Sequence, residues 1–503
     1  SLNISTSYSS LIFIITSPVD YYTIFFIFLV KLTKKGVFFM NIEDLKKFKK
    51  YNPDLKIREL KNGNTTVYII YFETLCKSNT INDFILRPIY DDKIKSLDDI
   101  KNKLPSGNLL EINDENTLYD NLYSGFTIIS IDNKFISFET KESLDSGIVT
   151  ATNEKVIKGP KDAFTENYQS NVGLIRKRIR SKNLKINEYT IGTSSKTKVA
   201  LFYLNDIVNK DLVNKIEKKL KTMSLDYVAN SNYIIDAMSK KNNIMPTNIM
   251  TERPDLTSFL LMEGRIAIMV ENSPQVIIIP MFFSDTIHTI DDYYQNSKNV
   301  SVTRIIRVIA FIISVTIPGM YLALTTFNQE ALPTSLLINF SIQRQGVPFP
   351  SIVEALVMFL IFEILKESDT RIPFVVGTSM SIVGALVLGQ AAVDAGLISP
   401  IMIIIIAVSS VTSFLFNDND LVNAIRVWKL IFILLSAFAG LYGFFIALLL
   451  FLVKISSMDS YGFDYVTVDG ILKSNIQKNG IILTKKFKLN KRNSVLTKNT
   501  ERR

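Results

Sequence analysis

The apolar residues of this chain crowd into one stretch, residues 301–455, and this crowding constrains the fold more than any other feature. A membrane-crossing helix needs about 20 predominantly apolar residues. Four segments reach that length: residues 305–327, 372–393, 398–416 and 427–453. Charged residues still make up 21% of the chain, so polar and apolar residues are segregated along it. The sequence predicts a multi-domain membrane protein in which a soluble α/β region precedes an all-α bundle of four to five spans.

A fifth apolar segment, residues 349–365, carries the carboxylates of Glu354 and Glu363. Carboxylates inside an apolar helix are costly and tend to face a cavity, a partner or water. Their spacing places the two on opposite faces of a helix, at about 100° per residue. We predict that one of them lines a water-filled ion path and that the other makes an interhelical contact. The alternative is a re-entrant or interfacial helix with both carboxylates in water.

The basic residues that flank the spans predict the orientation of the membrane region. Lys298, Arg304 and Arg307 precede the first span, and Lys454 begins a basic tail after the last one. Positive residues beside spans mark the cytoplasmic side. Both ends should therefore be cytoplasmic, which requires an even number of crossings. The net charge of +10 is therefore explained by membrane orientation, and it does not indicate a nucleic-acid partner.

The soluble region alternates strand-like and helix-like segments. Residues 65–72 and 198–204 are rich in β-branched and aromatic residues, which favours buried strands. Leu212, Ile216 and Leu220 then recur at helical spacing, which predicts an amphipathic helix over residues 211–223. We predict two α/β subdomains, residues 40–150 and 151–255, a connector, 256–300, a membrane domain, 301–455, and a basic, disordered tail, 456–503.

Four basic residues in five positions lie within the second subdomain: Arg176, Lys177, Arg178 and Arg180. One interpretation is the solvated face of a helix. The other is a binding surface for phospholipid headgroups or a partner protein.

The chain offers little for catalysis or metal binding. It has one cysteine, Cys76, and one histidine, His288, so disulfides and Cys/His zinc sites within the monomer are excluded. We expect Cys76 to be a small buried residue and His288 to be a surface or hydrogen-bonded one. The sequence contains no nucleophile-elbow, phosphate-loop or zinc-protease motif. We therefore predict neither enzyme activity nor a cofactor or metal.

The beginning of the chain is unusual, because Ser1 comes first and Met40 is the first methionine. Residues 11–32 are apolar, but Pro18 and Asp20 interrupt them, and the basic start and cleavage site of a signal peptide are missing. We expect translation to start at Met40, with residues 1–39 outside the native protein. The alternative is a genuine extra membrane anchor.

A long, ordered series of motifs runs from the soluble region into the spans. It comprises Gly159-Pro160-Lys161-Asp162-Ala163-Phe164-Thr165-Glu166-Asn167, Thr251-Glu252-Arg253-Pro254-Asp255, Glu263-Gly264-Arg265, Asp292-Tyr293-Tyr294, Thr325-Thr326-Phe327-Asn328-Gln329-Glu330, Gly346-Val347-Pro348-Phe349-Pro350 and Phe362-Glu363-Ile364-Leu365-Lys366-Glu367. The series resembles the A subunit of bacterial spore germinant receptors, the GerA family, over about residues 54–465. The motif positions near the membrane domain are Arg265, Gln329, Glu330, Gln343, Arg344, Pro348 and Gln390.

The resemblance implies a receptor in the inner membrane of a dormant endospore, with the soluble region on the core side. It implies a transporter-like B subunit and a lipoprotein C subunit as partners, and a small nutrient sensed by the complex. The A subunit is expected to form a homo-oligomer with an ion-conducting path. A non-conducting scaffold is the alternative, and a small secondary transporter is a weaker one because the membrane half is too short for repeat symmetry.

The chain departs from the family pattern at three places. Family members often have glycine in a turn where this chain has Asn272, so the asparagine must make that turn. Phe359 stands where a glutamate is common, one turn before Glu363, which would alter any conducting path. Beyond Tyr465 the usual family ending gives way to a Lys/Asn-rich tail.

Overall fold

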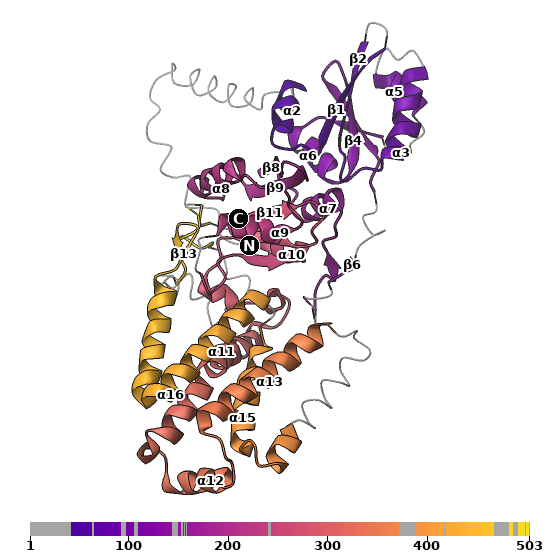
Figure 1. The fold of residues 1–503 in the computed structure, drawn as a ribbon. Coiled ribbons are helices and arrows are strands. Elements are labelled where there is room, and N and C mark those ends of the chain that lie inside the picture. Colours follow the sequence, from indigo (N-terminus) through magenta and orange to yellow (C-terminus); the bar gives the residue numbers. More distant parts are fainter. Residues whose placement is uncertain are drawn as a thin grey trace, which may run out of the picture. The chain divides into compact units, whose positions relative to one another are not determined.

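The computed structural model describes residues 42–501 with several gaps, and divides the chain into two compact units at Glu142 (Figure 1). The extension expected at residues 1–39 lies outside the described residues, as does most of the span expected at 372–393. The gaps are residues 63–64, 92–96, 105–108, 143–148, 152–153, 155, 157, 240–242, 372–388, 417, 467–481, 486–490 and 498.

The first unit is built on a five-stranded antiparallel sheet with the order β1-β2-β4-β5-β3. Ile81, Ile85 and Ile100 pack on one face of this sheet, and Leu118 and Leu122 are buried in α6. The elements are α2 (Ile42–Lys49), β1 (Leu55–Asn62), β2 (Thr65–Phe72), α3 (Ser78–Ile81), η1 (Asn82–Leu86), α4 (Arg87–Asp91), α5 (Leu97–Lys103), β3 (Leu109–Ile112), α6 (Glu115–Tyr123), β4 (Phe126–Ile131) and β5 (Lys134–Glu139).

The second unit begins with another five-stranded antiparallel sheet, of order β10-β12-β11-β9-β8. Its elements are β6 (Val149–Thr150), β7 (Asp162–Ala163), α7 (Tyr168–Arg178), β8 (Leu184–Ile191), β9 (Thr197–Leu204), α8 (Lys210–Thr222), α9 (Ser231–Met238), β10 (Ile249–Thr251), α10 (Pro254–Met262), β11 (Ile266–Val270) and β12 (Val276–Ile279).

Helices cover both faces of the second sheet. Ala267 and Met269 of β11 pack in the core that includes α7 and α10, whereas Ile266 and Ile268 pack in the core that includes α8 and α9. Successive side chains of a strand point to opposite faces, so a central strand covered on both sides must be apolar throughout. This explains the continuous apolar run of β11.

Residues 256–300, expected as a connector, contribute much of this sheet, because α10, β11 and β12 lie within them. The turn between β11 and β12 confirms the prediction for Asn272, whose φ is 63°. That left-handed conformation favours glycine, and asparagine is among the few other residues that tolerate it.

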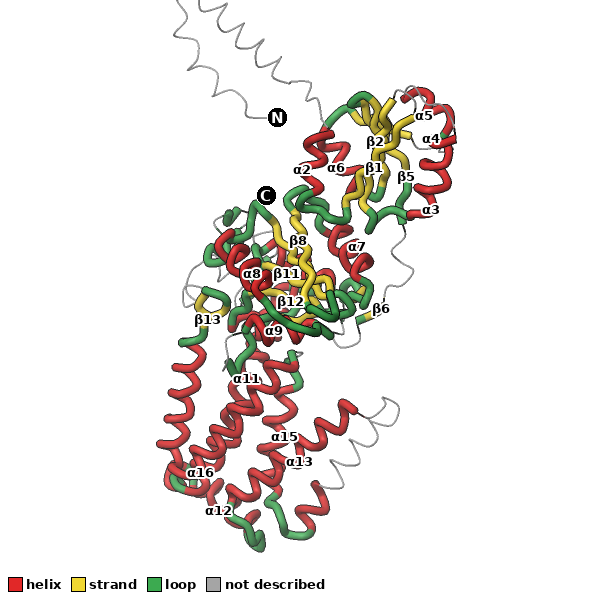
Figure 2. The backbone as a smooth tube through the Cα atoms, turned by 45° about the horizontal axis from the view of Figure 1, so that its top comes forward, coloured by secondary structure: helices red, strands yellow, loops and turns green. Residues whose placement is uncertain are grey.

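The apolar half of the second unit consists of packed helices (Figure 2). Among the described residues, two helices, α11 and α16, are long and apolar enough to cross a membrane by length and composition. The segment expected to span at 398–416 forms a helix of only 14 residues, α15. The elements are η2 (Phe283–Thr286), η3 (Ile290–Tyr293), α11 (Ser297–Thr326), η4 (Gln329–Ala331), α12 (Thr334–Arg344), α13 (Ser351–Arg371), α15 (Pro400–Ser413) and α16 (Asn419–Ser456).

The chain reverses inside α16, where one span was expected at 427–453. Ala439 and Gly440 have non-helical backbone angles, with φ of 56° at Gly440. The rings of Trp428 and Phe451 lie 4.9 Å apart, whereas a straight helix would separate these residues by about 35 Å. The helix is therefore a hairpin of two arms, residues 419–438 and 441–456, which lie side by side in Figures 1 and 2.

The proline inside α11 explains one contact between helices. Pro318 has no N–H to donate to the carbonyl of Ser314, one helical turn earlier. The buried hydroxyl of Ser409 on α15 donates to that carbonyl at 2.8 Å instead. A β-carbon on the next residue, Gly319, would lie 2.9 Å from the carbonyl oxygen of Phe432, so α11 and α16 approach each other closely here.

The described parts of the tail, expected to be disordered, pack on the second unit. Strands β13 (Asp459–Ser460) and β14 (Phe463–Asp464) form a small hairpin beside α8. Tyr465 is fully buried, and its carbonyl accepts from the backbone N–H of Phe283 at 3.0 Å. The hydroxyl of Thr497 donates to the carbonyl of Ile207.

Candidate functional site

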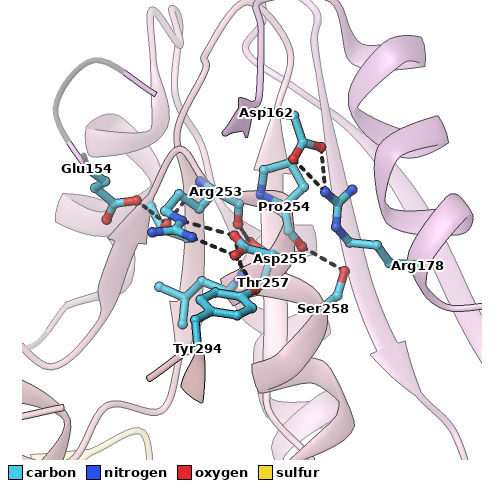
Figure 3. Close-up of polar contacts among 11 residues, drawn as sticks. Glu154, Asp162, Arg178, Arg253, Pro254, Asp255, Thr257, Ser258 and Tyr294 are labelled. Carbon is cyan, nitrogen blue, oxygen red and sulfur yellow. Dashed lines mark hydrogen bonds and ion pairs between the residues drawn. The ribbon is translucent and has the colours of Figure 1, made fainter. Parts of the chain in front are cut away.

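Three sequence motifs meet where the second sheet gives way to α11. The guanidinium of Arg253 donates to both carboxylate oxygens of Asp255, at 3.0 and 2.6 Å, and the hydroxyl of Tyr294 donates to the same carboxylate at 2.7 Å (Figure 3). The arginine and the aspartate are both buried. Burial and Asp255 raise the pKa of Tyr294, which keeps its hydroxyl protonated as a donor.

The local sequence places this group at the start of α10. Pro254 occupies the first turn, where a missing N–H costs nothing, and Asp255 follows it near the positive end of the helix dipole. The hydroxyls of Thr257 and Ser258 donate to the carbonyls of Arg253 and Pro254, at 3.0 and 2.7 Å (Figure 3). The Thr251–Asp255 motif is thus a helix start whose charges are fixed by their neighbours.

Arg265, a predicted motif position, forms a second buried ion pair nearby. Its two terminal nitrogens donate to the two carboxylate oxygens of Asp285, at 2.7 and 2.8 Å, and one of them also donates to the carbonyl of Pro280 at 2.9 Å. The guanidinium lies over the ring of Phe282, 5.4 Å from its centre. This pairing fixes η2 to the residue that precedes β11.

The third ion pair links η3 to the first turns of α11. Asp292 accepts from Arg304 at 2.8 Å and from Arg307 at 3.0 Å, and Arg304 is completely buried. Burial alone would raise the pKa of Asp292, but the two guanidiniums outweigh it and hold the pKa below its ordinary value. Arg304 is therefore a buried partner of a carboxylate, and Arg307 is a partly buried one.

A pocket of about 380 Å³ lies beside these pairs, between the second sheet and the start of α16. Arg253, Arg265 and Arg307 line it together with His288. Glu154 also lines it, and accepts from the hydroxyl of Thr251 at 2.6 Å. Burial raises the pKa of Glu154 to about 7. Its carboxyl therefore changes charge near neutral pH.

Glu354, one of the two predicted path carboxylates, is buried in the first turn of α13. Its carboxylate accepts from the backbone N–H and the hydroxyl of Ser399, at 2.9 and 2.7 Å. Arg344, another predicted position, lies 3.7 Å from the other carboxylate oxygen. Because Ser399 caps α15 and Arg344 ends α12, Glu354 joins three helices.

Glu363, the other predicted carboxylate, lies near the middle of α13 with 20% of its side chain exposed. One of its oxygens lies 2.5 Å from Nε of Arg426, on the first arm of α16. Both carboxylates thus make contacts between helices. A water-filled path along either one stays a prediction.

The remaining predicted positions lie near the ends of helices or in the segments that connect them. The side-chain amide of Gln329 donates to the carbonyl of Thr325 at 2.9 Å, and that of Gln390 donates to Asp394 at 3.0 Å. Glu330, Gln343 and Pro348 are exposed. The structure does not bring these five residues together with Arg265.

The basic run ends α7 and does not form a single surface. Arg176 is completely buried, and Arg178 pairs with Asp162, donating to it at 2.7 Å (Figure 3). Only Lys177 and Arg180 are exposed. Binding of a lipid or a partner by these two stays a prediction.

Cys76 is buried in the first unit, as expected. Burial raises the pKa of its thiol to about 11, so the thiol stays protonated at neutral pH and is a poor nucleophile.

Sequence reasoning found the motifs but missed their pairing. Asp285 was not singled out at all, and Arg304 and Arg307 were considered only for orientation. The available signal was the recurrence of lone carboxylates and arginines around short apolar strands, since buried charges require partners.

The sequence agrees with known proteins along most of its length. A family model described as Bacillus/Clostridium GerA spore germination protein matches residues 43–495. The chain belongs to this family. GerA proteins are not a known enzyme family, and membership supports a role of this chain in spore germination.

Two GerA relatives and one solved structure illustrate the similarity. Spore germination protein KA of Bacillus subtilis (strain 168) is 34% identical over 85% of this chain and 80% of its own length. Spore germination protein GerQA of Bacillus cereus is 33% identical over 84% and 85%. The crystal structure of the N-terminal domain of the A subunit of the Bacillus megaterium spore germinant receptor GerK3 is 27% identical, covering 48% of this chain and 96% of that one, with a TM-score of 0.35.

Proposed function

We propose that this GerA protein is the A subunit of a nutrient-sensing germinant receptor and triggers germination from the inner membrane of the endospore. The observation that carries the proposal is the family match over residues 43–495. Its proposed partners are a transporter-like B subunit, a lipoprotein C subunit and further copies of itself. The sensed ligand is a small nutrient.

The proposed placement is multi-pass, with the soluble sheets on the core side. Among the described residues, α11 is long and apolar enough for a span, and the apolar helix α16 is divided by its reversal into the arms 419–438 and 441–456. The hairpin in α16 supports a common side for its two ends, since Leu421 and Ile455 pack in one core with Met245 and Tyr465 of the soluble part. The basic residues Arg304 and Lys454 then lie on one side, as the predicted orientation requires. The full set of four to five spans is part of the proposal.

The proposed mechanism is a ligand-gated ion path in an oligomer of A subunits. Glu363 is the better candidate to line it, because its side chain is partly exposed whereas that of Glu354 is fully buried among three helices. The ion pairs of Asp255, Asp285 and Asp292 support a route by which movement of the second sheet reaches α11.

A non-conducting scaffold is the second candidate function. The contact between Glu363 and Arg426 favours it, because a carboxylate neutralised by a guanidinium attracts cations weakly. In that case the A subunit would hold the other subunits and conduct nothing itself.

Potassium efflux from liposomes tests the two candidates. The full chain is reconstituted with B and C subunits and nutrient, as wild type, Glu363→Gln and Glu354→Gln. If Glu363 lines the path, Glu363→Gln changes the flux per inserted protein, whereas Glu354→Gln mainly lowers the amount of folded protein. If correctly inserted wild type shows no nutrient-dependent flux, the result would favour the scaffold.

A further inference from the structure

Three basic side chains surround one carboxylate where α13 passes the first arm of α16. Arg426 contacts Glu363 at 2.5 Å. Lys366 lies three residues after Glu363, and Lys429 lies three residues after Arg426, so each shares a helix face with its neighbour. Lys429 interacts electrostatically with all three of the others. We call Lys366, Arg426 and Lys429 the basic cluster.

Within the part of the chain that the structure describes, the basic cluster has more positive charge than its neighbours balance. Glu363 is one carboxylate against three cations, and the next acidic residue of the helix, Glu367, is exposed. Lys429 is 2% exposed, and the charged groups that act on it are one carboxylate, Glu363, and two cations, Lys366 and Arg426. A buried positive charge that its neighbours do not balance is costly. The arrangement therefore calls for an added anion.

An exposed apolar surface adjoins the basic cluster. The ammonium of Lys366 lies over the ring of Phe414, 5.7 Å from its centre, and this ring is itself 60% exposed. The helices that carry or lead to these residues also expose large apolar side chains: Leu360 and Ile364 on α13, Val411 on α15 and Val427 on α16. A free inorganic anion would gain no binding energy from such an apolar surface. A molecule with an anionic head and apolar chains fits both the basic cluster and the apolar surface.

We propose that the basic cluster binds the phosphate of an anionic phospholipid whose acyl chains lie along the exposed side chains of α13, α15 and α16. The three cations supply the donors for the phosphate oxygens, and Glu363 orients the guanidinium of Arg426. Cations near the ends of spans commonly reach the headgroup region in this way. This inference rests on the membrane placement proposed above.

Native mass spectrometry of the full chain in detergent tests the site. The probes are phosphatidylglycerol and phosphatidylcholine with identical acyl chains. Wild type should retain phosphatidylglycerol in preference, and Lys429→Gln and Arg426→Gln should each lower that retention roughly fivefold, the effect of about 1 kcal/mol per cation. Lys429→Arg, which keeps the charge, should retain the lipid even if Lys429→Gln folds poorly. Lys298→Gln, which removes an exposed charge at the start of α11, should have no effect.

Three results would overturn the proposal. Wild type could bind the two lipids equally, Lys298→Gln could lower retention as much as Lys429→Gln, or inorganic phosphate at equal concentration could displace the lipid. A separate measurement, resistance of the protein to alkaline extraction from liposomes, distinguishes failure of the membrane placement from failure of the lipid site. An extractable protein refutes the membrane placement itself, whereas an inserted protein without headgroup preference refutes the lipid site alone.

Discussion

At the scale of single residues, Asp292 shows how the chain uses buried charge. Its carboxylate is 2% exposed and accepts from two arginines, and hydroxyl and backbone groups of Thr289 complete its hydrogen bonds. A buried ion pair contributes little net stability compared with apolar packing, but removal of one partner costs about 3–5 kcal/mol. Such a pair fixes a unique arrangement, here of η3 against α11.

Glu154 gives a prediction for pH dependence. Its folded pKa of about 7 lies above the ordinary value of 4.5, so the folded chain binds a proton more tightly than the unfolded chain. The free energy of unfolding should therefore be highest below about pH 4.5 and decrease as the pH rises toward about 7. Gln is a neutral substitute for the protonated acid, so Glu154→Gln should remove this dependence.

Thermal unfolding of the detergent-solubilised chain at about pH 5 and about pH 8 measures the effect of Glu154. The Tm of wild type should drop between these values by a few degrees more than the Tm of Glu154→Gln. The exposed Glu166→Gln is the control and should behave as wild type. Equal drops in wild type and Glu154→Gln would contradict the assignment.

At the scale of elements, the reversal of α16 depends on one glycine and one side-chain cap. Gly440 has a φ of 56°, and a β-carbon there would lie 2.6 Å from Cβ of Phe327. The side-chain oxygen of Asn328 accepts from the N–H of Leu441 at 3.1 Å, which gives a hydrogen-bond partner to a backbone N–H at the start of the second arm. The Thr325–Glu330 motif therefore holds the hairpin closed.

Gly440→Ala should destabilise the helical half of the protein, because alanine meets both an unfavourable backbone conformation and a steric clash. We expect a loss of at least about 1–2 kcal/mol, seen as a lower Tm and faster proteolysis between the two arms. Gly389→Ala is the matched control, since no described atom lies within 4 Å of the β-carbon it would add. Similar stability of the two variants would mean that the reversal tolerates a side chain.

The same elements show what sequence reasoning could and could not reach. Strand β2 was predicted with its exact residues, 65–72, and α8 within one residue, because long amphipathic or β-branched patterns are local. Strands β11 and β12 are only five and four residues long, so their patterns are weak. The α16 reversal was missed because apolar composition continues through it, and a glycine among small residues also fits close helix packing. The partners of Arg265 and Arg304 were not visible because tertiary pairing selects them.

At the scale of the whole molecule, buried ion pairs join the sheet of the second unit to the helices that follow it. Arg253 with Asp255, Arg265 with Asp285, and Asp292 with Arg304 follow one another along the chain toward α11. Interfaces that switch between two arrangements commonly repack their ion pairs. The proposed receptor subunit thus has a defined junction between the sheet and the first long helix.

The most direct test of this account is nutrient-triggered potassium release from spores that lack their own copy and carry either wild type or Asp292→Asn. The account predicts that deletion abolishes the response, that wild type restores it, and that Asp292→Asn slows it at a matched amount of protein in the inner membrane. Release at the wild-type rate by Asp292→Asn, at that matched amount, would contradict the role of the junction. An undiminished response in the deletion strain would contradict the role of the chain in germination itself.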